Sequence, residues 1–224
     1  MTSKALFFAV SGQTCSGRLS LYNGLRHELP RRFPYVEFEF IGKPFSEDLQ
    51  HPLLWSSVER RRFPTAKLLD RWGDLEQFNK HKGLEQLLKT GKIVVSHGFG
   101  LDAMMYAAAC ATCTDQNDEA FRMHDLLVKD RLSLNSITPP TYLITQADDT
   151  ITVDRMLQKH PLGNIRRDVL MEFVKYEKGV MDRYSHLKGQ HLEFINSSGP
   201  VNSLVERGVS FISAHIHQRD IHVA

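Results

Sequence analysis

Short apolar runs alternate with longer amphipathic segments along the chain, and this alternation constrains the fold more than any other feature. Each run has the length of a buried strand, and helical spacing of apolar residues follows most of them. The runs occupy residues 6–10, 36–40, 93–95, 142–144 and 192–195. Alternating strands and helices are typical of βαβ units, whose strands pair in parallel. The sequence therefore predicts an α/β fold with a doubly wound, five-stranded parallel sheet, whose ligands bind at the carboxyl ends of the strands.

Prolines and glycines mark where the expected helices end. The first helix is predicted over residues 17–29, with Pro30 and Pro34 ending it. Helical spacing covers residues 64–90 and stops at Gly91. A further helix is expected over residues 101–109, and the closing helix over residues 201–215.

The composition suits one globular domain. The chain has 224 residues, of which 42% are hydrophobic and 24% charged, so a single domain over residues 1–224 is expected. A formal net charge of only +2 argues against nucleic acid as a partner. The 3 cysteines are too few for a disulfide framework and favour a reducing compartment. Because no apolar run approaches the roughly 18 residues of a membrane helix, we expect a protein with no membrane contact. The expected location is the cytoplasm, and location in an organelle stays open as an alternative.

The segment between the first strand and the first helix carries the clearest motif. It reads Ser-Gly-Gln-Thr-Cys-Ser-Gly-Arg-Leu-Ser over residues 11–20, so Gly12 and Gly17 have the spacing of the phosphate-binding pattern G-x-x-x-x-G-K-[ST]. Backbone N–H groups at such a helix start can hold phosphate oxygens whatever the side chains are. Arg18 stands in place of the Lys, and Leu19 in place of the hydroxyl that binds Mg²⁺. Two interpretations stay open, a phosphate loop and a tight turn into a helix.

Further stretches follow this loop in a recognisable order. They are Lys43-Pro44 after the second strand, Leu69-Asp70-Arg71-Trp72, residues 91–99 around the third strand, and residues 141–155 around the fourth. Nearly end to end, this order resembles the thymidylate kinases, nucleoside monophosphate kinases with a P-loop NTPase fold. The resemblance implies ATP-dependent phosphorylation of dTMP to dTDP with Mg²⁺. It also implies a lid, expected at residues 157–168.

The chain departs from the family pattern at positions that serve phosphoryl transfer. Thr14 stands where the family has a carboxylate, and His97-Gly98 stands where it has an Asp-Arg pair. Gly42 replaces an arginine, and Leu19 cannot ligate a metal. Phosphoryl transfer relies on positioned cations and Mg²⁺, and the loss of one electrostatic group commonly costs a factor of about 10² to 10³. We therefore expect kinase activity to be weak or lost, and whether the chain is an active enzyme stays open.

The candidate site residues come from the loop and from the resemblance. The candidate catalytic cations are Arg18, together with Arg166 and Arg167 in the expected lid. The residues expected to contact nucleotide or phosphate are Gly12, Thr14, Ser16, Gly17, Arg18, Ser20, Lys43, Arg71 and His97. No residue is assigned as a metal ligand, and Mg²⁺ and ATP are expected only if the protein is active.

A second class of function also fits, an inactive structural or regulatory subunit that keeps the fold to contact other proteins. The apolar face of residues 101–109 predicts a homodimer or a protein partner. Residues 97–100 are similar to the oxyanion stretch of esterases, but no G-x-S-x-G motif accompanies them. Cys110 and Cys113 form a C-x-x-C without a second pair at zinc spacing, which favours free thiols.

Overall fold

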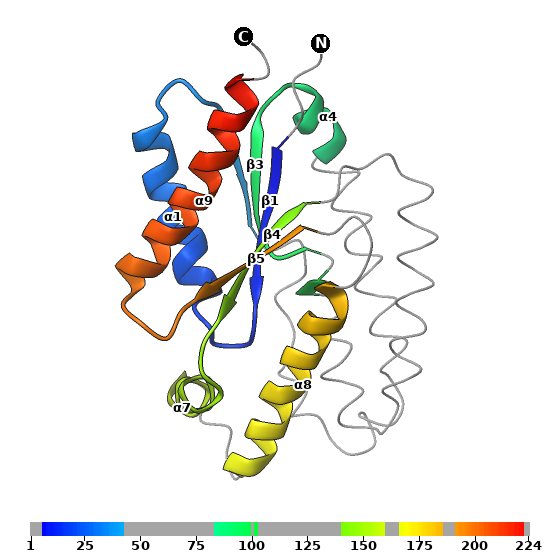
Figure 1. Ribbon diagram of the computed structural model, residues 1–224, viewed down its shortest axis with the longest axis vertical. Coiled ribbons are helices and arrows are strands. Elements are labelled where there is room, and N and C mark those ends of the chain that lie inside the picture. The colour runs from blue at the N-terminus through cyan, green and yellow to red at the C-terminus, as the bar shows by residue number, and fades with distance from the viewer. Residues whose placement is uncertain are drawn as a thin grey trace.

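The computed structural model describes residues 6–42, 83–99, 101–102, 140–159, 166–185 and 191–221. Strands and helices alternate through these segments (Figure 1). The elements are β1 (Leu6–Gly12), α1 (Arg18–Arg32), β2 (Phe38–Ile41), α4 (Leu84–Lys89), β3 (Ile93–His97), β4 (Thr141–Gln146), α7 (Asp149–Lys159), α8 (Arg167–Ser185), β5 (His191–Asn196) and α9 (Val201–Ile221).

The five strands form one sheet in the order β2-β3-β1-β4-β5, and every pair is parallel. The predicted five-stranded parallel sheet is therefore confirmed. β1 lies at the centre, between β3 and β4, and six of its seven residues are buried. Parallel strands covered on both faces read as continuous apolar runs, which is the pattern that residues 6–10 carry.

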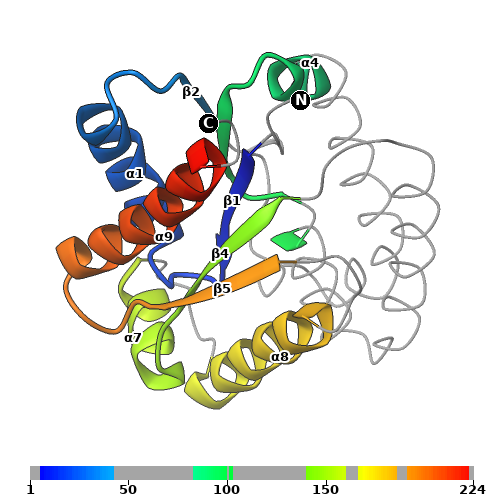
Figure 2. The same cartoon turned by 45° about the horizontal axis from the view of Figure 1, so that its top comes forward.

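Helices cover both faces of the sheet, so the fold is doubly wound. α1 and α9 lie on one face, and α4 and α8 lie on the other (Figures 1 and 2). Successive β1 side chains alternate between the two layers: Phe8 and Val10 pack with α1 and α9. Phe7 packs with α4, and Ala9 packs in a cluster that includes Met181 of α8.

The topology places a crevice at the carboxyl end of β1. From β1 the chain runs into α1 on one face, whereas after β3 it reaches Leu101, which packs against Ala9 and Tyr142 on the other. Neighbouring strands whose connections leave to opposite faces define a switch point, where ligands of open α/β sheets bind. The loop that follows β1 therefore lies at the expected binding edge of the sheet.

Several predicted boundaries are wrong by a few residues. Pro30 does not end α1 but lies inside it, where it removes a single backbone N–H hydrogen bond and only Arg31 and Arg32 follow it in the helix. β2 begins at Phe38 rather than at residue 36, since the N–H of Val36 closes a turn onto the carbonyl of Phe33. α9 extends beyond residue 215 to Ile221.

Other predictions fall wholly or partly outside the described residues. Only residues 83–90 of the segment 64–90, and only Leu101 and Asp102 of the segment 101–109, are described. Cys110 and Cys113 are not among them. Within the described part of the chain, no helix is both long enough and apolar enough to cross a membrane.

Two glycines let α1 and α9 approach closely. A Cβ on Gly24 of α1 would lie 2.2 and 2.8 Å from the two γ-carbons of Val205. A Cβ on Gly208 of α9 would lie 2.7 Å from Leu21 Cδ1. Gly179 of α8, in contrast, has nothing within 4 Å of such a Cβ. The two helical glycines of the α1–α9 contact are therefore required by packing, and Gly179 is not.

We expect Gly24→Ala to lower the free energy of unfolding by about 1–2 kcal/mol, because overpacking outweighs the gain in helix propensity. Gly179→Ala is the matched control and should raise the free energy of unfolding by up to about 1 kcal/mol. Chemical denaturation of both variants measures the two effects. A Gly24→Ala protein as stable as the wild type would show that the α1–α9 contact is looser than described.

Candidate functional site

The loop between β1 and α1 is fastened to the end of β4. Gly12 has φ 144°, and a Cβ there would lie 2.2 Å from the carbonyl oxygen of Thr145, so only glycine allows this approach. The N–H of Gln13 donates to the same carbonyl at 3.3 Å. The hydroxyl oxygens of Ser16 and Thr145 lie 2.6 Å apart. These contacts hold the chain over the end of the neighbouring strand.

The second half of the loop turns tightly into α1. The N–H and hydroxyl of Ser16 both donate to the carbonyl of Gln13, at 3.1 and 2.6 Å. Cys15 has φ 58° and Gly17 has φ 94°, so both lie in the left-handed region. Gly17 is the N-cap of α1, and no side chain caps the helix there. The turn therefore directs the start of α1 outward from the carboxyl end of β1.

The first backbone N–H groups of α1 are available to an acceptor. The initial N–H groups of any helix lack an intrahelical partner. Among the described residues, nothing accepts from the backbone N–H of Arg18, Leu19 or Ser20. Such groups, with the helix dipole behind them, attract anions.

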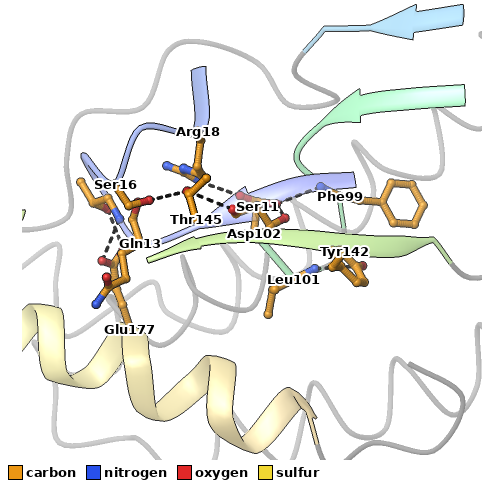
Figure 3. A network of polar contacts seen from close by, with 11 residues as sticks. Ser11, Gln13, Ser16, Arg18, Phe99, Leu101, Asp102, Tyr142, Thr145 and Glu177 are labelled. Carbon is orange, nitrogen blue, oxygen red and sulfur yellow. Dashed lines mark hydrogen bonds and ion pairs between the residues drawn. The ribbon is translucent and has the colours of Figure 1, made fainter. Parts of the chain in front are cut away.

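A carboxylate from α8 reaches the same loop. Glu177 Oε2 accepts from the backbone N–H of Thr14 at 2.9 Å, and Oε1 accepts from the hydroxyl of Thr14 at 2.6 Å. The Glu177 residue is only 4% exposed. Figure 3 shows it rising from α8 toward the loop. Thr14 alone therefore donates to both carboxylate oxygens of Glu177.

A second carboxylate engages the only basic residue of the loop. Asp102 accepts from Arg18 Nη1 at 2.5 Å, from the backbone N–H of Phe99 at 2.9 Å, and from the hydroxyl of Ser11 (Figure 3). The Asp102 side chain is 9% exposed and that of Arg18 31%. Arg18 is therefore directed toward its own protein rather than toward solvent.

Burial dominates the electrostatics of the loop. It raises the pKa of Glu177 from an ordinary 4.5 to about 7, against the lowering effects of the Thr14 hydrogen bonds and of Arg18. Asp102 contributes a smaller repulsion that also raises this pKa. Burial likewise raises the pKa of the Cys15 thiol. A carboxyl with such a pKa changes charge near neutral pH, which is common at functional sites.

A cavity of about 540 Å³ opens at the carboxyl ends of β4 and β5, next to the loop. Its volume falls within the range of about 300–1,000 Å³ that is usual for small-molecule sites. The N–H of Ala147, in its wall, donates to Gln13 Oε1 at 3.4 Å and so joins the cavity to the loop. Its lining is mostly polar and includes Gln146, Asp148, Asp149, Lys178, Asn196 and Ser198.

The structure brings together five of the predicted site residues. Gly12, Thr14, Ser16, Gly17 and Arg18 all lie in this loop or at the start of α1. Two further predicted residues are described nearby. Ser20 is exposed on the first turn of α1, and His97 ends β3, where it is buried and stacked on Tyr22 at 5.3 Å.

The other predicted residues do not join the loop in the described part of the chain. Arg166 pairs with Asp168, and Arg167 pairs with Asp154 at 2.6 Å, both on exposed surface. Both ends of the expected lid are helical, since α7 continues to Lys159 and α8 begins at Arg167. Lys43 and Arg71 lie outside the described residues.

The residues of the loop do not fit a Mg²⁺ ion. Leu19, at the hydroxyl position of the motif, is 55% exposed and offers no ligand atom. The hydroxyl of Ser16 is already bonded to Gln13 and Thr145. Within the described segments, no three His, Cys, Asp or Glu side chains are grouped to hold a metal.

Sequence reasoning missed four residues that build the site, namely Ser11, Asp102, Thr145 and Glu177. Glu177 follows Leu170, Phe173 and Val174 at helical spacing, so it falls on the apolar stripe of α8. A charged residue on such a stripe is a signal for a buried interaction. Asp102 carries no comparable signal, because its contacts depend on how the chain folds after β3.

No protein-family model matches the chain, and comparison with curated proteins finds no match.

Glu177 should make the stability of the protein depend on pH. Its raised pKa means that the native state binds this proton more tightly than the unfolded chain does. The stabilisation is fully present below about pH 4.5 and is lost as the pH rises through about 7. Glu177→Gln should remove this loss, so that it exceeds the wild type at pH 8 by on the order of 3 kcal/mol and approaches it near pH 5.

Denaturant unfolding at several pH values measures this difference. Glu172→Gln is the matched control, since Glu172 is an exposed residue of the same helix, and it should keep the wild-type profile. Parallel pH profiles for the wild type and Glu177→Gln would contradict the buried carboxyl described here.

Proposed function

We propose that this chain is a nucleotide-binding protein of the thymidylate kinase type, with a P-loop fold, whose phosphoryl transfer is weak or lost. The observation that carries the proposal is the loop between β1 and α1. It lies at the switch point of the parallel sheet, and the backbone N–H groups of residues 18–20 have no acceptor among the described residues.

The loop has the components that bind a phosphate group. Backbone N–H donors and the dipole of α1 favour negative charge at this helix start. Arg18 follows the N-cap and can offer a planar fork of donors to phosphate oxygens. The left-handed backbone at Cys15 and Gly17 keeps the turn tight and leaves its outer side to a ligand.

The adjoining cavity supports a nucleotide rather than a free phosphate. It lies beside the loop and has the volume of a small-molecule site. Its carboxylate, amide and hydroxyl side chains can accept and donate hydrogen bonds to a sugar or a base. We therefore assign the loop to the phosphates and the cavity to the nucleoside part.

The same loop supports only weak catalysis. Arg18 is already paired with Asp102, so its charge is largely neutralised before a ligand arrives. Leu19 offers no metal ligand, and Thr14 is bonded to Glu177. Phosphoryl transfer depends almost entirely on positioned charges. Without free charges and metal ligands at these positions, we expect little acceleration of the reaction.

The alternative is an inactive structural or regulatory subunit. One observation favours it: Glu177 accepts the hydrogen bonds of Thr14, and Asp102 pairs with the charge of Arg18, so both groups already have partners within the protein. We also propose a homodimer or a protein partner that contacts residues 101–109, and a cytoplasmic location. Anion binding separates the two functions, because the structural subunit requires none.

We expect the wild-type protein to bind ATP or inorganic phosphate, and Arg18→Ala to bind them about tenfold or more weakly, because a charged hydrogen-bond donor is lost. Arg31→Ala is the matched control, since Arg31 is an exposed arginine of the same helix. Calorimetric titration of the three proteins measures the affinities. No binding to the wild type at millimolar ligand, or equal binding to all three proteins, would show that the loop is only a turn into α1 and binds no phosphate.

We expect turnover of ATP and dTMP with Mg²⁺ to lie far below the roughly 1–100 s⁻¹ that is typical of kinases. The physical reason is that Thr14, Leu19, His97 and Gly98 replace groups that position charge in the family. A coupled spectrophotometric assay for ADP measures the rate. Turnover in the ordinary range would mean that other residues perform the catalysis.

A further inference from the structure

We propose that the Glu177 carboxylate occupies the anion site of the loop at Thr14. A phosphate group would then bind there only when Glu177 has left Thr14 or is neutral. This inference rests on the proposed function, because it concerns the regulation of the same loop. Glu177 is a positioning residue in this account and takes no part in a chemical step.

The geometry of the contact is that of a bound anion. Both carboxylate oxygens are engaged by Thr14, one by its backbone N–H and one by its hydroxyl, at 2.9 and 2.6 Å. A backbone N–H of a loop before a helix is a group that phosphate oxygens use in other proteins. Glu177 comes from α8, 163 residues further along the chain. The loop donor is therefore occupied by tertiary structure, not by a local turn.

The charge of Glu177 is poorly compensated. Among the described residues, no Lys, Arg or His forms an ion pair with it, and the nearby Arg18 is paired with Asp102. A buried carboxylate without a cation is costly. Phe173 and Val174, one helical turn before Glu177 on α8, are buried in an apolar cluster with Val153 of α7. A purely structural contact at this place would be served better by a neutral side chain.

The charged groups around Glu177 come from several elements. Arg18 of α1 favours its ionised form, and Asp102, which follows β3, opposes it. The Cys15 thiol of the loop also interacts with Glu177, and Arg155 and Lys159 of α7 interact with that thiol. The resulting pKa of Glu177 is about 7. An incoming dianion adds repulsion, so it should bind together with a proton.

The consequence is that anion binding depends on pH through one residue. If only the neutral form of Glu177 admits the ligand, the apparent affinity falls with the neutral fraction. For a pKa of about 7, that fraction changes about tenfold between pH 6 and pH 8. Inorganic sulfate is the suitable probe, because its own charge does not change in this range.

Sulfate titration of the full chain by calorimetry tests the inference. The wild type should bind sulfate about tenfold more weakly at pH 8 than at pH 6. Glu177→Gln should bind about tenfold more tightly than the wild type at pH 8 and lose most of the pH dependence. Glu172→Gln, on the exposed face of the same helix, should behave like the wild type.

A second measurement needs no variant and shows whether a carboxyl group takes up the proton. Infrared difference spectra of the wild type at pH 8, with and without sulfate, should gain the carbonyl band of a protonated carboxylic acid. An imidazole that took up the proton would give no such band. Absence of the band on a sulfate-bound wild type would overturn the inference even if Glu177→Gln does not fold.

The outcomes separate the two proposals. Equal sulfate affinities and equal pH slopes for the wild type and Glu177→Gln would overturn the role of Glu177 and leave the phosphate loop standing. Binding by both proteins at pH 6, with Glu177→Gln binding more tightly than the wild type at pH 8, would support both. No binding of sulfate or ATP by any of the proteins would overturn the proposed function, and the inference with it.

Discussion

The close approach of Gly12 to Thr145 is the contact on which the site depends. It joins the end of the central strand to its neighbour β4, and no side chain fits at residue 12. Because the chain is held there, the following residues turn over the end of the sheet. That turn puts Thr14 beside α8 and directs Arg18 toward Asp102. The loop geometry is thus imposed by the sheet rather than by the loop sequence alone.

The fold could be predicted because each strand carries a local signal. The runs at residues 6–10, 93–95 and 142–144 are apolar since both faces of those strands are covered. Boundaries were less predictable where a tertiary contact outweighs a local preference. Pro30 is tolerated within α1 because Leu25 and Leu29, which precede it in the helix, are fully buried against the sheet and α9.

The site could be predicted only in part. The glycine spacing predicts the loop and the five residues that the structure brings together there, but it does not predict the groups that bind those residues. Glu177 and Asp102 come from elements 163 and 84 residues away from their partners in the loop. No local pattern specifies which distant acid meets which donor. The position of Glu177 on the apolar stripe of α8 was the one available signal.

The central claim is that this loop holds anions, its own carboxylate or a ligand's phosphate. The most direct test is to follow the backbone amide resonances of the protein during a sulfate titration. We expect the shifts to concentrate at Thr14 and at residues 18–20, with the amide of Thr14 changing as Glu177 leaves it. Shifts spread over exposed lysines and arginines, with these amides unchanged, would contradict it.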